Sequence, residues 1–290
     1  MDSLTLSLIQ TGSLAGTVTF MFSRGLVTRK EDFWYLGARP WLLLKSLITI
    51  DALVPLIAIA VIIFARPSKA TAVGMLLLAA SPVAPMALKS ILNAGGDREY
   101  ALCLHLVLAW LAIVTTPITL ELLSGVAGLR LEVGPEEVAG IVGQSILLPI
   151  NAGVIAGMLF PSAARHMIRP LEVFSGVVST LVTIILLLST YQLLFTLDIG
   201  SYLAIALMIA GALAAGHLIA GRRPGERATL ALESATGNVG LALLIASTFT
   251  TLDYALPVII PYIAISAIIC AIYARLLTRE SRSATPGRTV

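Results

Sequence analysis

The sequence predicts an all-α, polytopic membrane protein, and three observations support this prediction. Hydrophobic residues make up 58% of the 290 residues and charged residues only 12%, a balance that excludes a soluble globular domain. The apolar residues are gathered in long runs, and a helix needs roughly 20 such residues to cross a bilayer. Short alternating segments typical of strands are absent, so the runs are expected to be transmembrane helices.

Nine transmembrane helices are expected, joined by short connections into a single transporter-sized unit over residues 1–290. They span residues 5–23, 41–64, 71–93, 100–122, 138–160, 169–192, 198–220, 228–249 and 254–277. No cleavable signal is expected, because no basic region precedes the first apolar run. The polar residues 278–290 are expected to form a cytoplasmic tail.

Positive residues lie mainly on alternate connections, which predicts the orientation of the chain in the cell (inner) membrane. One set of connections, with the C-terminal end, carries fourteen: Arg24, Arg29, Lys30, Arg39, Arg98, Arg165, Arg169, Arg222, Arg223, Arg227, Arg275, Arg279, Arg282 and Arg288. The opposite connections carry Arg66, Lys69 and Arg130. Because positive loops stay in the cytoplasm, the N-terminus is expected outside and the C-terminus inside.

Composition and motifs also argue against several other functions. The net charge of +3 comes from cations on one membrane side, so nucleic acid is not an expected partner. Cys103 and Cys270 lie far apart in apolar runs, and we expect both to be inert buried thiols. The chain has no HExxH motif, and its three histidines lie on different helices or loops, so neither an enzyme nor a cofactor is expected.

The second run contains an acid well inside the membrane. Asp51 is followed by Pro55, and a carboxylate is expensive in lipid, so Asp51 should face protein or water. Two interpretations stay open here. Asp51 either bonds to a neighbouring helix at a proline kink or belongs to a functional site.

The third run is expected to be a broken helix. Pro82 and Pro85 remove backbone donors and free upstream carbonyls. At membrane depth, exposed backbone survives only where it is buried in protein or lines a cavity. Lys89 follows the break, and its long stem either reaches the cytoplasmic interface or presents an internal cation to the rest of the site.

The fourth run carries His105, either a hydrogen-bonded core residue or a group that titrates near neutral pH. The polar connection 122–138 falls near the middle of the chain and is expected to join two halves. The ninth run is broken early by Pro257 and Pro261.

The eighth run holds the strongest candidate site. The segment Glu233-Ser-Ala-Thr-Gly-Asn-Val-Gly240 places an acid, an amide and two glycines where lipid-facing residues would be only apolar. Intramembrane acids mark functional sites by default, so Glu233 is the central candidate. Ser234, Thr236 and Gly237 belong to the same candidate site, and Asn238 has either a site role or a polar packing role.

The third and eighth runs lie five helices apart and therefore cross the membrane in opposite directions. Broken helices at matching places in two oppositely oriented halves are typical of inverted-repeat secondary transporters, with the site at the midplane. We expect residues 1–122 and 138–277 to be the two repeats, the first being shorter. At such a crossing, half-helix N-termini attract anions and freed carbonyls coordinate cations.

Five motifs in order resemble the bile acid:sodium symporter family, specifically its ten-helix bacterial members from their second helix onward. They are Phe20-Met-Phe-Ser-Arg-Gly-Leu26 with Glu31-Asp-Phe33, Ser81-Pro82, Ala94-Gly-Gly-Asp97, Leu147-Leu-Pro149 and Gly237-Asn-Val-Gly-Leu241. The resemblance implies a panel domain (first, fifth and sixth helices) and a core domain containing two broken, crossing helices. It also implies an organic-anion substrate bound between these domains, alternating access and sodium symport.

The sequence departs from this family at its sodium ligands. Positions matching the first sodium site are Ala87, Leu88, Ala101, His105 and Glu233, and only the acid is kept. Ile50, beside Asp51, and Gly237 stand where the second site has glutamines. A hard cation needs about five or six oxygens. No complete metal site is therefore predicted, although a residual sodium site at Glu233, Ser234 and Thr236 stays open.

These losses suggest that another cation balances Glu233. We hypothesise that Lys89, with His105 assisting, substitutes for sodium, because an ammonium within about 4 Å would neutralise the acid. Transport would then be independent of sodium, or coupled to protons through Lys89, His105 or Glu233.

Other functions stay open beside a secondary transporter of a bile-acid-like anion or carboxylate metabolite. A proton-coupled antiporter or auxin-carrier-like permease shares crossed broken helices, and a non-transporting membrane receptor could keep the fold with a degraded ion site. The expected surroundings are a lipid bilayer and a small organic anion. Substrate identity, direction of transport and oligomeric state are not predicted.

Overall fold

The computed structural model describes residues 3–28, 35, 37–84, 87–126, 134–248 and 252–283. Within these ranges the chain is helical and contains no strand, so the prediction of an all-α polytopic membrane protein is confirmed. Some positions considered above lie outside the described residues: Arg29, Lys30, the segment 31–33, Pro85, Arg130 and Arg288.

The helices follow one another with few long connections. They are α1 (Ser3–Val27), α3 (Pro40–Leu47), η1 (Ile48–Leu53), α4 (Val54–Ala65), α5 (Lys69–Ala79), α6 (Ala87–Asn93), α7 (Arg98–Val126), α8 (Pro135–Val142), η2 (Gly143–Leu147), α9 (Leu148–Leu159), α10 (Pro161–Thr190), η3 (Tyr191–Thr196), α11 (Ile199–Ile219), α12 (Pro224–Ala235), α13 (Val239–Thr248) and α14 (Leu252–Ser283). The last helix extends into the residues that were expected to form a tail.

The structure corrects the expected number of membrane-spanning helices. Eight segments of the described chain are long and apolar enough to span a bilayer: Leu4–Val27, Pro40–Ala65, Arg98–Gly125, Pro135–Leu159, Pro161–Thr190, Ile199–Ile219, Pro224–Thr248 and Ala255–Leu277. The expected span 71–93 is not among them. Its backbone leaves the helix after Ala79, and neither α5 nor α6 alone has the length of a span.

Two spanning helices contain a π-helical turn directly before a proline. The turn η1 precedes Pro55, and η2 precedes Pro149. Proline lacks a backbone donor and clashes with the carbonyl four residues earlier, and a wider turn accommodates this defect. Asp51 lies in the first of these turns.

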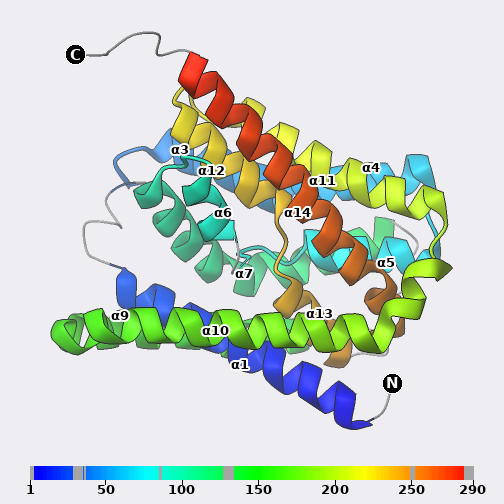
Figure 1. Ribbon diagram of the computed structural model, residues 1–290, viewed down its shortest axis with the longest axis horizontal. Coiled ribbons are helices and arrows are strands. Elements are labelled where there is room, and N and C mark those ends of the chain that lie inside the picture. Colours follow the sequence, from blue (N-terminus) through cyan, green and yellow to red (C-terminus); the bar gives the residue numbers. More distant parts are fainter. Residues whose placement is uncertain are drawn as a thin grey trace.

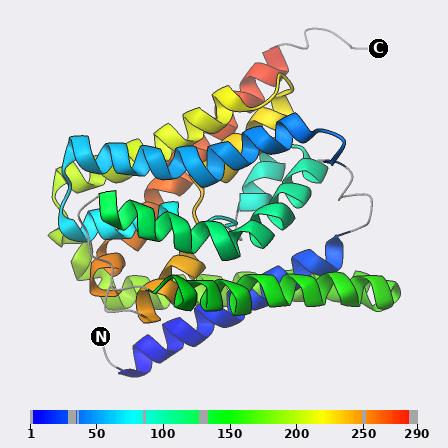
Figure 2. The same ribbon diagram turned by 180° about the vertical axis from the view of Figure 1, so that it is seen from behind.

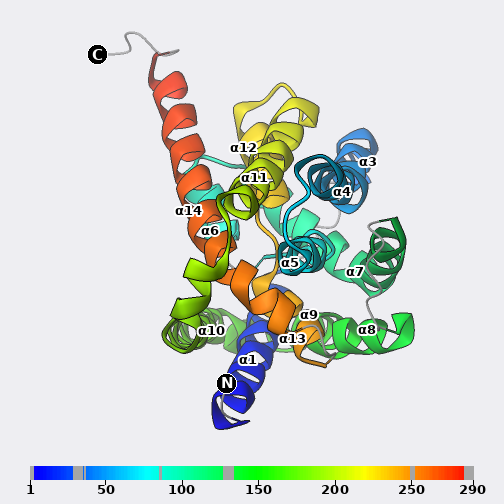
Figure 3. The same ribbon diagram turned by 90° about the vertical axis from the view of Figure 1, so that its right-hand side faces the viewer.

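The helices are arranged in two parts. Figure 1 shows α1, α9 and α10 running side by side along one edge, and Figure 3 shows α8 continuing the same edge. We call α1, α8–α9 and α10 the outer layer and the remaining helices the crossing unit. Figure 2 shows α3 and α4 on the side of the crossing unit that faces away from the outer layer.

Glycines allow the helices of the outer layer to approach closely. A Cβ atom at Gly25 would lie 2.2 Å from the carbonyl oxygen of Ile150, and one at Gly153 would lie 2.2 Å from that of Phe22. These backbone contacts join α1 to α9 without intervening side chains, as small residues do in membrane helix pairs. The outer layer is therefore built as one tightly packed body.

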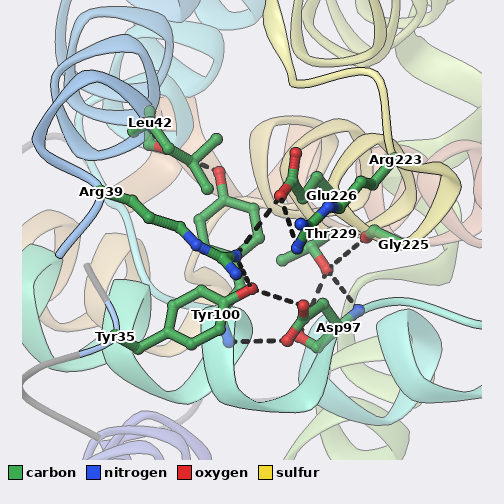
Figure 4. Close-up of polar contacts among 10 residues, drawn as sticks. Tyr35, Arg39, Leu42, Asp97, Tyr100, Arg223, Gly225, Glu226 and Thr229 are labelled. Atoms are coloured by element: carbon green, nitrogen blue, oxygen red, sulfur yellow. Dashed lines mark hydrogen bonds and ion pairs between the residues drawn. The ribbon is translucent and has the colours of Figure 1, made fainter.

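A polar network joins the connection before α3 to the ends of two other elements (Figure 4). The Tyr35 hydroxyl donates to Asp97 Oδ2 at 2.5 Å, and Arg39 Nη1 lies 3.4 Å from Glu226 Oε1. The Asp97 backbone N–H donates to Thr229 Oγ1 at 2.9 Å. Burial and the bond to Asp97 raise the pKa of Tyr35, so its phenol remains a donor. The network fixes the α6–α7 turn against α12.

Candidate functional site

The two helix breaks meet inside the crossing unit. The Asn238 backbone N–H donates to the Ser81 carbonyl at 2.7 Å, and Asn238 Nδ2 donates to the Val83 carbonyl at 3.0 Å. Asn238 Oδ1 accepts from the Leu241 N–H at 3.0 Å and so caps α13. The backbone and side chain of one buried residue therefore satisfy two carbonyls freed in the first break and a donor freed in the second, as unwound backbone requires.

The backbone at the first break is strained. Val83 has φ of 65°, a left-handed conformation that is rare for a β-branched residue. Val83 is also the residue whose carbonyl Asn238 holds. Such strained residues persist only where their surroundings over-determine them, and they gather at functional sites.

Hydroxyl groups of helix α14 anchor the second break, which lies between α12 and α13. The Gly237 N–H donates to the Tyr262 hydroxyl at 2.6 Å, and that hydroxyl donates to the Ala235 carbonyl at 3.2 Å. Ser266, one turn further along α14, donates to the same carbonyl at 3.3 Å. The unwound residues between α12 and α13 are thus anchored by two hydroxyls from a third helix.

Glu233 is buried one turn before this break. Its side chain is 1% exposed, and His105 Nδ1 on α7 lies 3.5 Å from its Oε2 atom. The same Nδ1 is 3.0 Å from the Ala101 carbonyl. Neither carboxylate oxygen of Glu233 has a hydrogen-bond partner within the described chain. The acid is therefore positioned beside an imidazole but keeps coordination capacity on both oxygens.

A small cavity of about 20 Å³ opens beside Glu233. Ser234, Thr236 and Gly237 line it together with Ser81 and Pro82 from the first break. The Ser234 hydroxyl, like the carboxylate, lacks a hydrogen-bond partner among the described residues. Because one water needs about 10–15 Å³, the space suits one water molecule or one small cation with oxygen ligands.

Chemistry of the transition-metal type is not supported by the side chains present. In the part of the chain that the structure describes, no three His, Cys, Asp or Glu residues are grouped so that they could hold a metal ion. The oxygen donors of Glu233 and Ser234 instead match the preference of hard cations. A monovalent cation would be held there by a carboxylate, a hydroxyl and backbone carbonyls of the unwound segment.

Lys89 does not balance Glu233, which corrects the hypothesis made from the sequence. Its side chain is exposed and lines a different cavity, between α6 and the outer layer. Within the described residues, the basic side chain found within 4 Å of Glu233 is His105.

Asp51 is also separate from the crossing. It does not line the cavity beside Glu233, although its neighbour Ile50 does. Its Oδ2 atom is buried in the π-helical turn and has no hydrogen-bond partner in the described ranges. Pro82 lies at the first break as expected, whereas Pro85 is outside the described residues.

A larger cavity of about 550 Å³ lies between the crossing and the outer layer. Its wall is mainly apolar, with hydroxyls from four helices and the second break: Ser13 and Thr17 of α1, Ser90 of α6, Ser179 and Thr183 of α10, Tyr262 and Ser266 of α14, and Thr236. A cavity of this size with a few polar groups is typical of small-molecule sites. We call it the main cavity.

Tyr262 and Ser266 were not predicted as site residues from the sequence. Both lie on the smooth part of the last run, where their spacing of four residues places them on one helical face together with Cys270. All three line the main cavity. This polar stripe in an apolar helix was the signal that could have identified them.

The comparisons with known proteins agree with this architecture. Over 155 residues the chain is 26% identical to an uncharacterized sodium-dependent transporter, YocS, of Bacillus subtilis (strain 168). The aligned segment makes up 53% of this chain and 47% of that protein. The chain thus spans about half the length of this curated relative. The model of the Sodium Bile acid symporter family matches residues 15–197, more than half of the chain. The chain therefore belongs to the Sodium Bile acid symporter family.

Proposed function

We propose that this protein is a secondary active transporter of a small organic anion. The observation that carries the proposal is the contact of two helix breaks beside the main cavity, with the buried carboxylate of Glu233 at the crossing. Membership in a symporter family supports it. Unwound backbone at membrane depth is typical of transporter sites at the interface between repeats.

In this proposal the outer layer acts as the panel domain and the crossing unit as the core domain that the resemblance implies. The main cavity is lined from both sides, by α1 and α10 of the outer layer and by α13 and α14 of the crossing unit. A movement of one part against the other would open the cavity to alternate sides of the membrane. In this proposal the inverted repeats supply the two opposed breaks.

Coupling is proposed to run through one monovalent cation held by Glu233 and Ser234. The name of YocS as a sodium-dependent transporter favours sodium as that ion. His105 places its imidazole beside Glu233, at a position where the family resemblance implies a hydroxyl ligand. In this proposal the imidazole stands in for one ion, and the cavity of about 20 Å³ holds a single other.

The test is uptake of labelled organic anions by the purified protein in liposomes. Candidate anions are first selected by the thermal shift that they cause, since a ligand of the folded state raises apparent stability. We expect uptake that depends on an inward sodium gradient with a hyperbolic dependence on sodium, as for one site. Uptake that is unchanged when choline replaces sodium contradicts the cation site.

The other outcomes separate the remaining functions. Uptake driven by a pH gradient in choline assigns the coupling to protons. Cation flux without any organic anion favours an antiporter. Binding without uptake in the same vesicles indicates a receptor.

A further inference from the structure

A second, larger cavity lies on the other side of α6. Its volume is about 1420 Å³, and α1, α6, α7, α9 and α10 line it. Among the described residues, five cationic side chains line it, namely Arg24, Lys89, Arg98, Arg165 and Arg169, together with two acids, Glu99 and Glu172. We call this space the basic vestibule. The described residues of its wall carry a net charge of three positive units, whereas those of the main cavity wall supply hydroxyls and no cationic side chain.

Most of these cations lack an acidic partner. Arg24 forms an ion pair with Glu172. Within the described ranges, Lys89, Arg98 and Arg169 have no carboxylate within 4 Å, and Glu99 is the single other acid of the vestibule wall. Like charges gathered around one space repel each other, so an anion that enters it gains attraction from several sides.

Arg24 gives this vestibule a fixed and buried cation. The residue is 7% exposed, and its guanidinium lies 4.9 Å from the ring centre of Phe20. Although Glu172 holds one end of the guanidinium, Nε is buried without a hydrogen-bond partner in the described part of the chain. Arg98 is close enough to act on Arg24 electrostatically. A guanidinium held this way is preorganised for a carboxylate, sulfate or phosphate group.

The vestibule and the main cavity are neighbours along α10. Ser179 lines both spaces. Helix α6 stands between them, with Leu88, Lys89 and Leu92 towards the vestibule and Ser90 and Asn93 towards the main cavity. A molecule of moderate length could therefore have its apolar part in one space and its charges in the other.

We propose that the transported molecule is an organic dianion with an apolar body. The body occupies the main cavity, and the anionic groups are held in the basic vestibule by Arg24, Arg98 and Lys89. This inference rests on the proposed transport function and narrows its substrate class. A single negative charge would engage one of these cations and leave the others unbalanced, so two charges match the vestibule better.

Matched pairs of acids test this inference in nanodiscs of neutral lipid. The probes are octanoate against hexylmalonate and benzoate against phthalate. The members of each pair share an apolar body, and the dianion carries its two carboxylates at one end of it. We measure binding by thermal shift and uptake in liposomes. We expect each dianion to bind at least about ten-fold more tightly than its monoanion, as for a gained charge-assisted bond.

The variants are Arg98→Gln and Lys89→Gln, both at exposed positions without ion pairs in the described chain. Each is expected to reduce the preference for dianions about three- to ten-fold, because partly screened charges contribute modestly. Arg222→Gln is the matched control, since it removes an exposed arginine that does not line the vestibule. Equal binding of both acids, or an unchanged preference in both variants, overturns the inference.

Two further outcomes keep the inference separate from the proposed function. Uptake of monoanions alone overturns the dianion assignment and leaves the transporter standing. Stabilisation by anionic lipid in nanodiscs, with none by the soluble dianions, also overturns it and makes the vestibule a lipid headgroup site. Absence of uptake for every acid counts against the transport function itself.

Discussion

Single polar side chains hold the unwound backbone of this protein at membrane depth. Asn238 satisfies groups from both breaks, and Tyr262 satisfies both a donor and an acceptor of the second break. Lipid offers no hydrogen-bond partner that could replace these groups. The site therefore depends on a few hydrogen bonds more strongly than on the apolar residues around it.

Removal of the Tyr262 hydroxyl tests this dependence. We expect Tyr262→Phe to leave the Gly237 N–H without its partner and to lower stability by about 1–3 kcal/mol, the cost of a buried unsatisfied group. Thermal unfolding of the purified protein measures the effect. Tyr191→Phe, at an exposed position, is the control and should change little. Equal melting temperatures for the Tyr262 variant and wild type would show that contacts other than the Tyr262 hydroxyl stabilise the break.

The residues at the crossing were only partly predictable. Glu233 and Asn238 stood out because an acid and an amide interrupt an apolar run, and the structure brings Asn238 to the first break as the crossing requires. Lys89 was assigned wrongly because the rotation of α6 depends on irregular residues after Ala79. Helical periodicity does not continue through such residues. The spacing of residues along the sequence therefore does not predict the direction of a side chain beyond them.

At the level of elements, α1 and α9 pack backbone against backbone in the outer layer. This packing depends on glycines whose neighbours are backbone atoms, which cannot move aside as a flexible side chain can. The positions of these helices in the sequence were predicted from hydropathy. Their contact was not, because lipid-facing and partner-facing surfaces of a membrane helix are both apolar.

Alanine substitutions at the glycines test this packing. We expect Gly25→Ala and Gly153→Ala each to destabilise the protein by about 1–3 kcal/mol, since a Cβ atom there overlaps backbone of the partner helix. Gly140→Ala in α8 is the matched control, because nothing lies within 4 Å of its added Cβ. Melting temperatures in detergent report the difference. If all three variants melt alike, α1 and α9 do not pack as described.

The breaks themselves were predictable as elements, but their consequence for the helix count was not. Pro82 and the Gly237–Asn238 pair indicated where helices stop. The first break takes up enough residues to leave two short helices in place of one span, whereas the second is short and its two helices still reach the length of a span together.

For the whole molecule, the distribution of positive residues predicts orientation in the membrane. Cysteine labelling of intact cells tests it with Arg222→Cys in the connection before α12 and Glu136→Cys at the start of α8. Both positions are exposed, and the native Cys103 and Cys270 are buried, which keeps background labelling low. We expect an impermeant reagent to label position 136 from outside and position 222 only after lysis. The reverse pattern would invert the proposed topology.

The central claim is that the buried carboxylate at the crossing couples cation binding to movement of an organic anion. Accumulation of the labelled anion by liposomes containing Glu233→Gln tests it directly, because glutamine keeps the shape of the side chain and removes its charge. We expect this variant still to show a thermal shift with the anion but no longer to accumulate it under a sodium gradient. Accumulation equal to wild type would show that the charge of Glu233 is not needed for coupling.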